Sequence, residues 1–205
     1  MTYSIIGSGG VGAALARQFA RSDITVGLAN SRGPESLASL AKELGEKVVP
    51  LTLQDALKAD VIILAVPFWS HLDVAKAAPT WQGKIVIDAT NAYGVPLSDL
   101  NNLPSSAIVA RALPGAHLVK AFNHFPAGVL AQDPATAGGR RVIFLSGDDE
   151  AATAKVTALV HQLGYAPVNL GKIAEGGQLV QARDKSWASL IFQDLFKMDA
   201  VKPAG

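Results

Sequence analysis

The first half of the chain alternates between short apolar runs and longer amphipathic segments. The apolar runs predict strands at residues 3–6, 25–29, 47–50, 61–66 and 85–89. The fourth run is continuously apolar, as a strand covered on both faces is, so we expect it in the middle of the sheet. Strand patterns that alternate with helical patterns are typical of βα units that build a parallel sheet. The predicted fold class is therefore α/β, with a Rossmann doubly wound, mostly parallel sheet.

Two helices in this half follow from the spacing of apolar side chains. Val11, Leu15 and Phe19 recur at helical intervals directly after the first strand. Pro34 suits the first residue of a second helix, and Gly45 suits the position just after its end.

The second half has a less regular pattern. It predicts extra strands at 118–122, 141–145 and 168–170, and a short helix to Leu113 that is capped by Ser105 or Ser106. The acidic turn at 147–150 predicts the start of a helix that ends at Leu163, because negative charge suits the positive end of a helix. We expect a glycine-rich loop at 171–181 and a terminal amphipathic helix over 187–198. The predicted organisation is a main domain at 1–181 and a C-terminal helix within 182–205, which packs on that domain or in a dimer interface.

Composition and charge exclude several kinds of partner and chemistry. The 205 residues include 18 basic and 17 acidic side chains, a formal net charge of +1, which leaves no electrostatic footprint for nucleic acid or an anionic membrane. Cysteine is absent, which excludes disulfides, thiolate metal sites and cysteine nucleophiles. The four histidines show no metal-ligand spacing, and no apolar run reaches the roughly 18 residues of a membrane span. We expect a cytoplasmic protein with a small-molecule partner and no metal, nucleic acid or membrane.

Residues 7–12 fit the pattern G-x-G-x-x-G. The pattern follows an apolar strand and opens an amphipathic helix, which is the context that a dinucleotide-binding fingerprint requires. Gly7 permits the tight turn, Gly9 lets the backbone approach a pyrophosphate, and Gly12 lets helix and strand pack closely. The amides of the remaining loop residues are expected to face the phosphates: Ser8, Gly10 and Val11. The alternative is a glycine turn that only packs a helix on a sheet.

Asn30, Ser31 and Arg32 stand where such units usually carry an acidic residue. In NAD-binding units a carboxylate about 20 residues after the glycines accepts hydrogen bonds from the ribose 2′-hydroxyl. A carboxylate would repel a 2′-phosphate, whereas Ser31 can donate a hydrogen bond and Arg32 offers a planar, charged fork. This exchange favours NADP(H) and makes residues 1–181 an NADP-binding domain. The alternative is an ordinary solvated arginine.

Ligands in a doubly wound sheet lie beyond the carboxyl ends of the strands, so the residues after each strand are further candidates. A rigid shelf for ribose and nicotinamide is predicted after the fourth strand, and an uncharged amide after the fifth: Ala65, Val66, Pro67 and Asn91. A substrate pocket is predicted from four more residues at the same edge: Phe68, Trp69, Asn123 and His124. Phe68 and Trp69 also suit simple core packing, and His124 also suits a satisfied structural histidine.

Seven segments resemble those of the NADP oxidoreductases dependent on coenzyme F420, and of related dinucleotide-binding oxidoreductases that include the cytoplasmic domain of the transmembrane metalloreductases. They are IIGSGGVGAALARQFA, ANSRGPESLASLA, DVIILAVPFWSHLDVA, GKIVIDATNAYG, VKAFNHFPAGVL, VIFLSGDDEAA and EGGQLVQ, and the resemblance runs over roughly residues 3–181. The resemblance implies NADP(H) as cofactor, F420 or a flavin as second substrate, and a homodimer with the C-terminal helix near the partner. It places residues 31–32 at the 2′-phosphate, 8–11 at the pyrophosphate and 65–67 beside the cofactor. The F420 enzymes carry a histidine where this chain has Asn123.

The leading interpretation is an NADPH-dependent oxidoreductase that transfers hydride between nicotinamide and a flavin-like acceptor. The sequence identifies no catalytic residue, because it lacks a serine nucleophile elbow, a lysine–tyrosine pair at helical spacing and an acidic pair. Such a transfer needs little beyond the positioning of two cofactors. The alternatives are an NADPH-dependent imine or carbonyl reductase, and a non-catalytic NADP(H) sensor that a partner protein reads.

Overall fold

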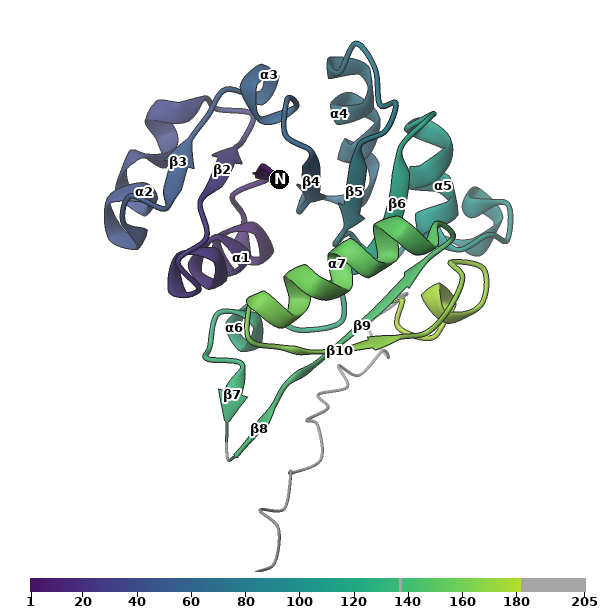
Figure 1. Ribbon diagram of the computed structural model, residues 1–205. Helices are drawn as coiled ribbons and strands as arrows, with labels where there is room; N and C mark the ends of the chain where they lie inside the picture. Colours follow the sequence, from purple (N-terminus) through teal and green to yellow (C-terminus); the bar gives the residue numbers. More distant parts are fainter. Residues whose placement is uncertain (137, 182–205) are drawn as a thin grey trace, which may run out of the picture.

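An eight-stranded sheet organises the fold, with helices on both of its faces (Figure 1). The computed structural model describes residues 1–136 and 138–181. The strands of the sheet are β1 Tyr3–Ile6, β2 Val26–Ala29, β3 Val48–Pro50, β4 Val61–Leu64, β5 Ile85–Asp88, β6 His117–Ala121, β9 Val142–Gly147 and β10 Ala166–Asn169. They lie in the order β10-β9-β6-β5-β4-β1-β2-β3, so the six N-terminal strands have the Rossmann order. The α/β prediction and the central place of β4 are confirmed.

Helices pack on both faces of the sheet. They are α1 Gly10–Arg21, α2 Ala38–Leu44, α3 Leu53–Ala56, α4 His71–Ala77, α5 Ser105–Ala112, α6 Ala127–Leu130 and α7 Glu150–Gln162. Single 3₁₀ turns lie at Pro34–Leu37, Phe68–Ser70, Leu97–Leu100 and Gly176–Gln178. The helices α1 and α7 pack on one face, and α3, α4 and α5 pack on the other.

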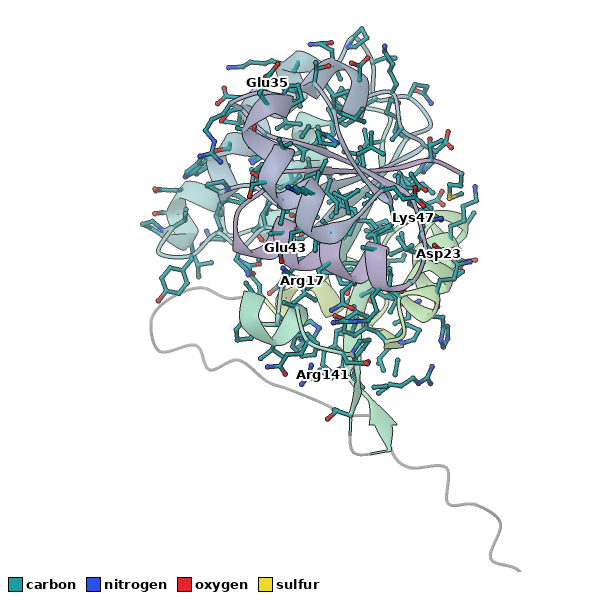
Figure 2. All side chains as sticks on the ribbon, turned by 90° about the vertical axis from the view of Figure 1, so that its left-hand side faces the viewer. Arg17, Asp23, Glu35, Glu43, Lys47 and Arg141 are labelled. Atoms are coloured by element: carbon teal, nitrogen blue, oxygen red, sulfur yellow. The ribbon has the colours of Figure 1, made fainter. Side chains whose placement is uncertain are left out.

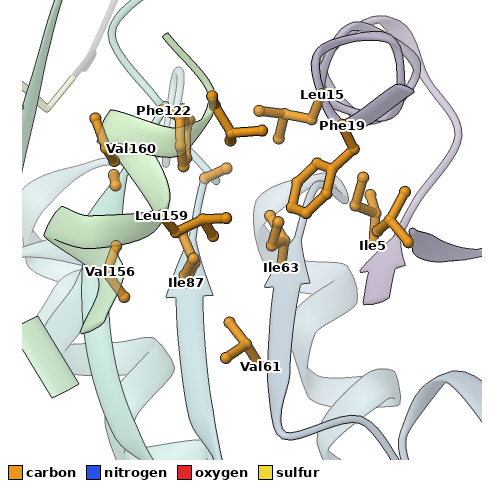
Figure 3. Packing of buried hydrophobic residues seen from close by; sticks show 14 of the residues in the cluster. Ile5, Leu15, Phe19, Val61, Ile63, Ile87, Phe122, Val156, Leu159 and Val160 are labelled. Atoms are coloured by element: carbon orange, nitrogen blue, oxygen red, sulfur yellow. The ribbon is translucent and has the colours of Figure 1, made fainter. Parts of the chain in front are cut away.

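Alternating strand residues divide the core between these faces. Under α1 and α7, Ile5, Ile63 and Ile87 of adjacent strands meet Phe19 of α1 and Leu159 of α7, all five almost fully buried (Figure 3). The intervening residues face the other helices: Ile6, Ile62, Leu64 and Val86. Burying a large aliphatic or aromatic side chain contributes about 1.5–3 kcal/mol, so this two-sided core fixes the strand ends that carry the candidate site.

Two features were not predicted from the hydrophobic pattern. Strand β9 pairs antiparallel with β6, whereas the other pairs in the sheet are parallel. A separate ribbon, β7 Ala135–Thr136 with β8 Gly139–Arg140, is too short to leave a periodic pattern.

The predicted cap at Ser105 or Ser106 is wrong. Both serines lie inside the first turn of α5, and Pro104 precedes the helix without a side-chain cap. Their hydroxyls are buried, and the Ser106 hydroxyl donates to Asp88 instead. At α7 the prediction is confirmed, because the Asp149 carboxylate accepts from the Ala152 amide at 2.7 Å.

Ion pairs on the surface join neighbouring elements of the N-terminal half. Arg17 of α1 pairs with Glu43 of α2, and Lys47 pairs with Asp23 at 2.9 Å (Figure 2). Exposed pairs of this kind contribute about 0–1 kcal/mol each, so the packing of Leu40 against the core is the firmer attachment of α2.

The predicted terminal helix and dimer interface at 182–205 lie outside the described residues. Across 1–136 and 138–181, each helix is too short or too polar to cross a bilayer.

Candidate functional site

The glycine loop between β1 and α1 is packed too closely for side chains at two of its positions. Gly7 has φ +109°, and a Cβ there would lie 2.2 Å from the carbonyl oxygen of Ala65. A Cβ on Gly12 would lie 1.8 Å from the carbonyl oxygen of Gly7. The turn and the close helix–strand packing predicted for these glycines are therefore visible as backbone contacts.

Gly9 differs from both, because a Cβ built there would meet nothing within 4 Å. Its φ of −69° is open to any residue, and it precedes α1 without a side-chain cap. The first amides of a helix lack intrahelical acceptors, so the N-terminus of this 12-residue helix presents donors beside open space. Gly10 and Val11 begin that helix.

Asn30 holds the loop that follows β2. Its Nδ2 donates to Ser8 Oγ and to Ser36 Oγ, each at 2.9 Å, and its Oδ1 accepts from the Arg32 amide at 2.9 Å. The side chain thus ties the glycine loop to the Ser31–Arg32 turn. A carboxylate at position 30 could not donate the hydrogen bonds to Ser8 and Ser36. Arg32 is exposed, and no hydrogen bond or ion pair to a described residue engages its guanidinium.

These segments surround one pocket of about 540 Å³ at the carboxyl ends of β1, β2 and β4. It is lined by Ile6, Gly7, Ser8, Gly9, Asn30, Ser31, Arg32, Leu53, Ala65, Val66, Pro67, Ser70, Asp73 and Val74. The chain reverses its direction of winding between β1 and β4, which is where doubly wound sheets bind ligands. Nine of the predicted cofactor residues therefore meet in a single cavity of ordinary ligand size.

Asn91 and Asn123 form a reciprocal pair beyond this pocket, at the ends of β5 and β6. Asn91 Nδ2 donates to the Asn123 carbonyl at 2.7 Å, and Asn123 Nδ2 donates to Asn91 Oδ1 at 3.0 Å. Asn123 Nδ2 also donates to the Val180 carbonyl at 2.9 Å. The pair joins two strand ends and the 171–181 segment.

The other three substrate-pocket candidates occupy different surroundings. Phe68 is buried in the core under α3–α5, whereas Trp69 is 46% exposed. The two rings pack edge-on, with their centroids 4.8 Å apart. His124 is buried; its Nε2 accepts from the Phe144 amide at 3.1 Å, and its ring packs edge-on against Phe125. These contacts support a packing role for Phe68 and a structural role for His124.

A buried ion pair lies beneath the asparagine pair and was not recognised in the sequence. Lys120 Nζ lies 3.1 Å from Asp88 Oδ2, and both side chains are at most 1% exposed. Burial alone would raise the pKa of Asp88, but the Lys120 ammonium and hydrogen bonds from Ser106 and Thr90 outweigh it and hold that pKa below its usual value. A lone Asp and a lone Lys 32 residues apart carry no spacing signal; only their register on adjacent strands pairs them.

Comparison with known proteins finds a similarity to one family over the part of the chain that carries this site. Residues 2–92 match the family described as NADP oxidoreductase, coenzyme F420-dependent. A crystal structure of the hypothetical protein SMa0349 from Sinorhizobium meliloti is 44% identical, with a TM-score of 0.86 and 95% of each chain covered. A putative F420-dependent NADP-reductase from Arthrobacter sp. FB24 is 26% identical, with a TM-score of 0.72, covering 88% of this chain and 90% of that one.

The curated relatives are longer proteins. Metalloreductase STEAP3 of Rattus norvegicus is 28% identical over 178 residues, which are 85% of this chain and 35% of the rat protein. The chain thus spans about a third of the length of the curated relatives it matches. The glycine loop, the Ser31–Arg32 turn and the shelf after β4 all fall within residues 2–92, the part of the chain that is similar to the family of coenzyme F420-dependent NADP oxidoreductases.

Proposed function

We propose that the protein is an NADPH-dependent oxidoreductase that transfers hydride between nicotinamide and a flavin-like acceptor, F420 or a flavin. The Ser31–Arg32 turn is the observation that supports NADP(H) as the cofactor. It lies in the pocket at the end of β2, and the Arg32 guanidinium has no partner among the described residues. A guanidinium can donate two parallel hydrogen bonds to a phosphate, and Ser31 adds a hydroxyl donor.

The rest of the pocket fits the remainder of NADP(H). The open space at Gly9 and the free amides at the start of α1 suit a pyrophosphate. Apolar side chains of Leu53 and Val74 line the same cavity and suit an adenine face. Ala65–Pro67 also line this cavity, so we assign them to the predicted shelf for ribose and nicotinamide.

Bound NADPH supplies the hydride from its nicotinamide ring. The protein's own contribution is position, because hydride transfer between stacked rings needs no acid or base from the chain. The loops that follow β5 and β6 carry the side-chain amides of Asn91 and Asn123, which suit the positioning of the nicotinamide ring. Trp69 presents an exposed aromatic face at the end of β4, which suits a planar acceptor.

The acceptor class is supported by the family description and by the name of the Arthrobacter relative. A homodimer is also part of the proposal, and size-exclusion chromatography with light scattering tests it.

The test follows NADPH absorbance after addition of F420, FMN, FAD or riboflavin. We expect oxidation with at least one of them. Tight NADPH binding without oxidation by any acceptor would favour a redox sensor, and oxidation by cyclic imines or ketones alone would favour an imine or carbonyl reductase.

A matched pair of variants tests the acceptor face. Trp69→Ala should raise KM for the acceptor, whereas Leu72→Ala, another exposed apolar residue on the same segment, should not. Equal effects of the two would remove Trp69 from the acceptor site.

A further inference from the structure

The Asp88 carboxylate of the Asp88–Lys120 ion pair accepts four hydrogen bonds. Asp88 Oδ1 accepts from the Thr90 amide at 2.9 Å and the Thr90 hydroxyl at 2.7 Å, while Oδ2 accepts from Ser106 Oγ at 2.5 Å and Lys120 Nζ at 3.1 Å. Lys120 Nζ also donates to the Thr90 carbonyl at 2.7 Å. All four side chains are at most 2% exposed.

Stability alone does not explain this arrangement. The desolvation of two charges offsets their attraction, and well-packed apolar residues of similar volume often give an equal or higher free energy of unfolding. The surrounding sheet is built from such residues, because Ile87 and Val119 immediately precede Asp88 and Lys120 on the same strands. The pair instead supplies geometry, since it holds the amide, carbonyl and hydroxyl of Thr90 together.

Thr90 immediately precedes Asn91, so the ion pair fixes the start of the loop that carries it. Asn91 then exchanges hydrogen bonds with Asn123, three residues beyond Lys120. The 171–181 segment joins the same cluster, because Asn123 donates to the Val180 carbonyl and Gln181 Oε1 accepts from the Ser105 amide at 3.1 Å. One buried cluster therefore sets the positions of both strand ends.

These strand ends lie on the β4-β5-β6 half of the sheet, whereas the Ser31–Arg32 turn lies on the β1-β2-β3 half. A dinucleotide crosses a doubly wound sheet at the reversal between the halves, one mononucleotide on each. We propose that Asp88 and Lys120 are positioning residues that act through Thr90, Asn91 and Asn123 on the nicotinamide half of NADP(H). The inference rests on the proposed function, and it assigns no contact between the ion pair and the cofactor.

The test compares two ligands that share the adenine half, NADPH and adenosine 2′,5′-bisphosphate. Asp88→Asn leaves the Lys120 charge buried and is a risk to folding, so milder variants are used. Ser106→Ala removes one donor to the carboxylate, and Thr90→Val removes another while keeping the side-chain shape. The matched control is Ser4→Ala, which deletes an equally buried hydroxyl that donates to the Ala56 carbonyl at 2.7 Å on the opposite side of the reversal.

We expect Ser106→Ala and Thr90→Val each to raise the Kd for NADPH about fivefold, because each variant removes one hydrogen bond that orders the loop. The Kd for adenosine 2′,5′-bisphosphate should stay within about twofold, and Ser4→Ala should change neither Kd while lowering thermal stability similarly.

Three results would contradict the inference. Folded Ser106→Ala and Thr90→Val proteins that bind NADPH like the wild type would overturn it, and so would equal losses for both ligands. Wild-type protein that binds neither ligand would overturn the proposed function, and this inference with it. If the wild-type protein binds both ligands, an unexpected result with the variants contradicts only the positioning role of the ion pair.

Discussion

Two single-methyl substitutions in the glycine loop should separate folding from nucleotide binding. In Gly12→Ala the new Cβ would lie 1.8 Å from the Gly7 carbonyl oxygen and 2.8 Å from its carbon, well inside the roughly 3.5 Å of ordinary contact. These atoms belong to main chain that also hydrogen-bonds β2 through the Gly7 amide, so they cannot move freely. Overpacking of this kind costs about 3 kcal/mol, and the better helix propensity of alanine returns about 1 kcal/mol. The free energy of unfolding should fall by about 2 kcal/mol.

Gly9→Ala adds the same methyl group without a steric cost in the protein. Nothing lies within 4 Å of the new Cβ, and the backbone conformation at Gly9 suits alanine. Stability should change by less than about 0.5 kcal/mol. The methyl would occupy the space through which the backbone approaches a pyrophosphate, and each charge-assisted hydrogen bond lost there is worth about 1.5–3 kcal/mol, so NADPH should bind at least tenfold more weakly.

Urea unfolding and a fluorescence titration with NADPH measure both quantities in both variants. The steric reasoning is refuted if Gly12→Ala is as stable as the wild type. The assignment of the open space to a phosphate is refuted if Gly9→Ala binds NADPH unchanged.

Two further predictions concern buried polar groups. The pKa of Asp88 is held below its unfolded value, so its contribution to the free energy of unfolding is complete above about pH 4–5 and is lost as pH falls through the folded pKa. Urea midpoints from pH 7 to 3 should show that loss, and Ser106→Ala should make it smaller because it moves the folded pKa back toward the unfolded one; a larger loss in the variant would contradict this cause. Tyr165→Phe should lower the free energy of unfolding in urea by about 1 kcal/mol, because it removes the hydrogen bond from the Tyr165 hydroxyl to the Leu130 carbonyl, 2.9 Å long. The loss should be no larger, because Gln18 Nε2 still donates to that carbonyl. A loss of 3 kcal/mol or more would mean that Gln18 does not compensate.

The sequence was sufficient for those parts of the fold that depend on local pattern. The continuous apolar run of β4, the glycine stop at Gly45 and the acidic cap at Asp149 each act within a few residues, and each appears where it was predicted. The glycine loop and the Ser31–Arg32 turn were found because the fingerprint sets their spacing, and the structure gathers them in one pocket.

The parts that were missed depend on contacts between distant residues. Ser106 has a capping residue's chemistry, but the buried Asp88 carboxylate takes its hydroxyl, so local propensity gave the wrong role. Asn30 was read as a missing acid, and its function as the link between Ser8 and Ser36 follows only from the fold. The antiparallel entry of β9 likewise has no periodic signature, because a strand's pattern is the same in either direction.

In the proposed function the pocket selects NADP(H) over NAD(H) through Ser31 and Arg32. The most direct measurement is the Kd of NADPH and of NADH for the wild type and for Arg32→Ala. An arginine–phosphate contact is worth about 2–3 kcal/mol, so we expect the variant to bind NADPH roughly 30- to 150-fold more weakly and NADH within about twofold of the wild type. Equal losses for the two nucleotides, or a wild type that binds NADH as tightly as NADPH, would show that Ser31 and Arg32 do not select NADP(H).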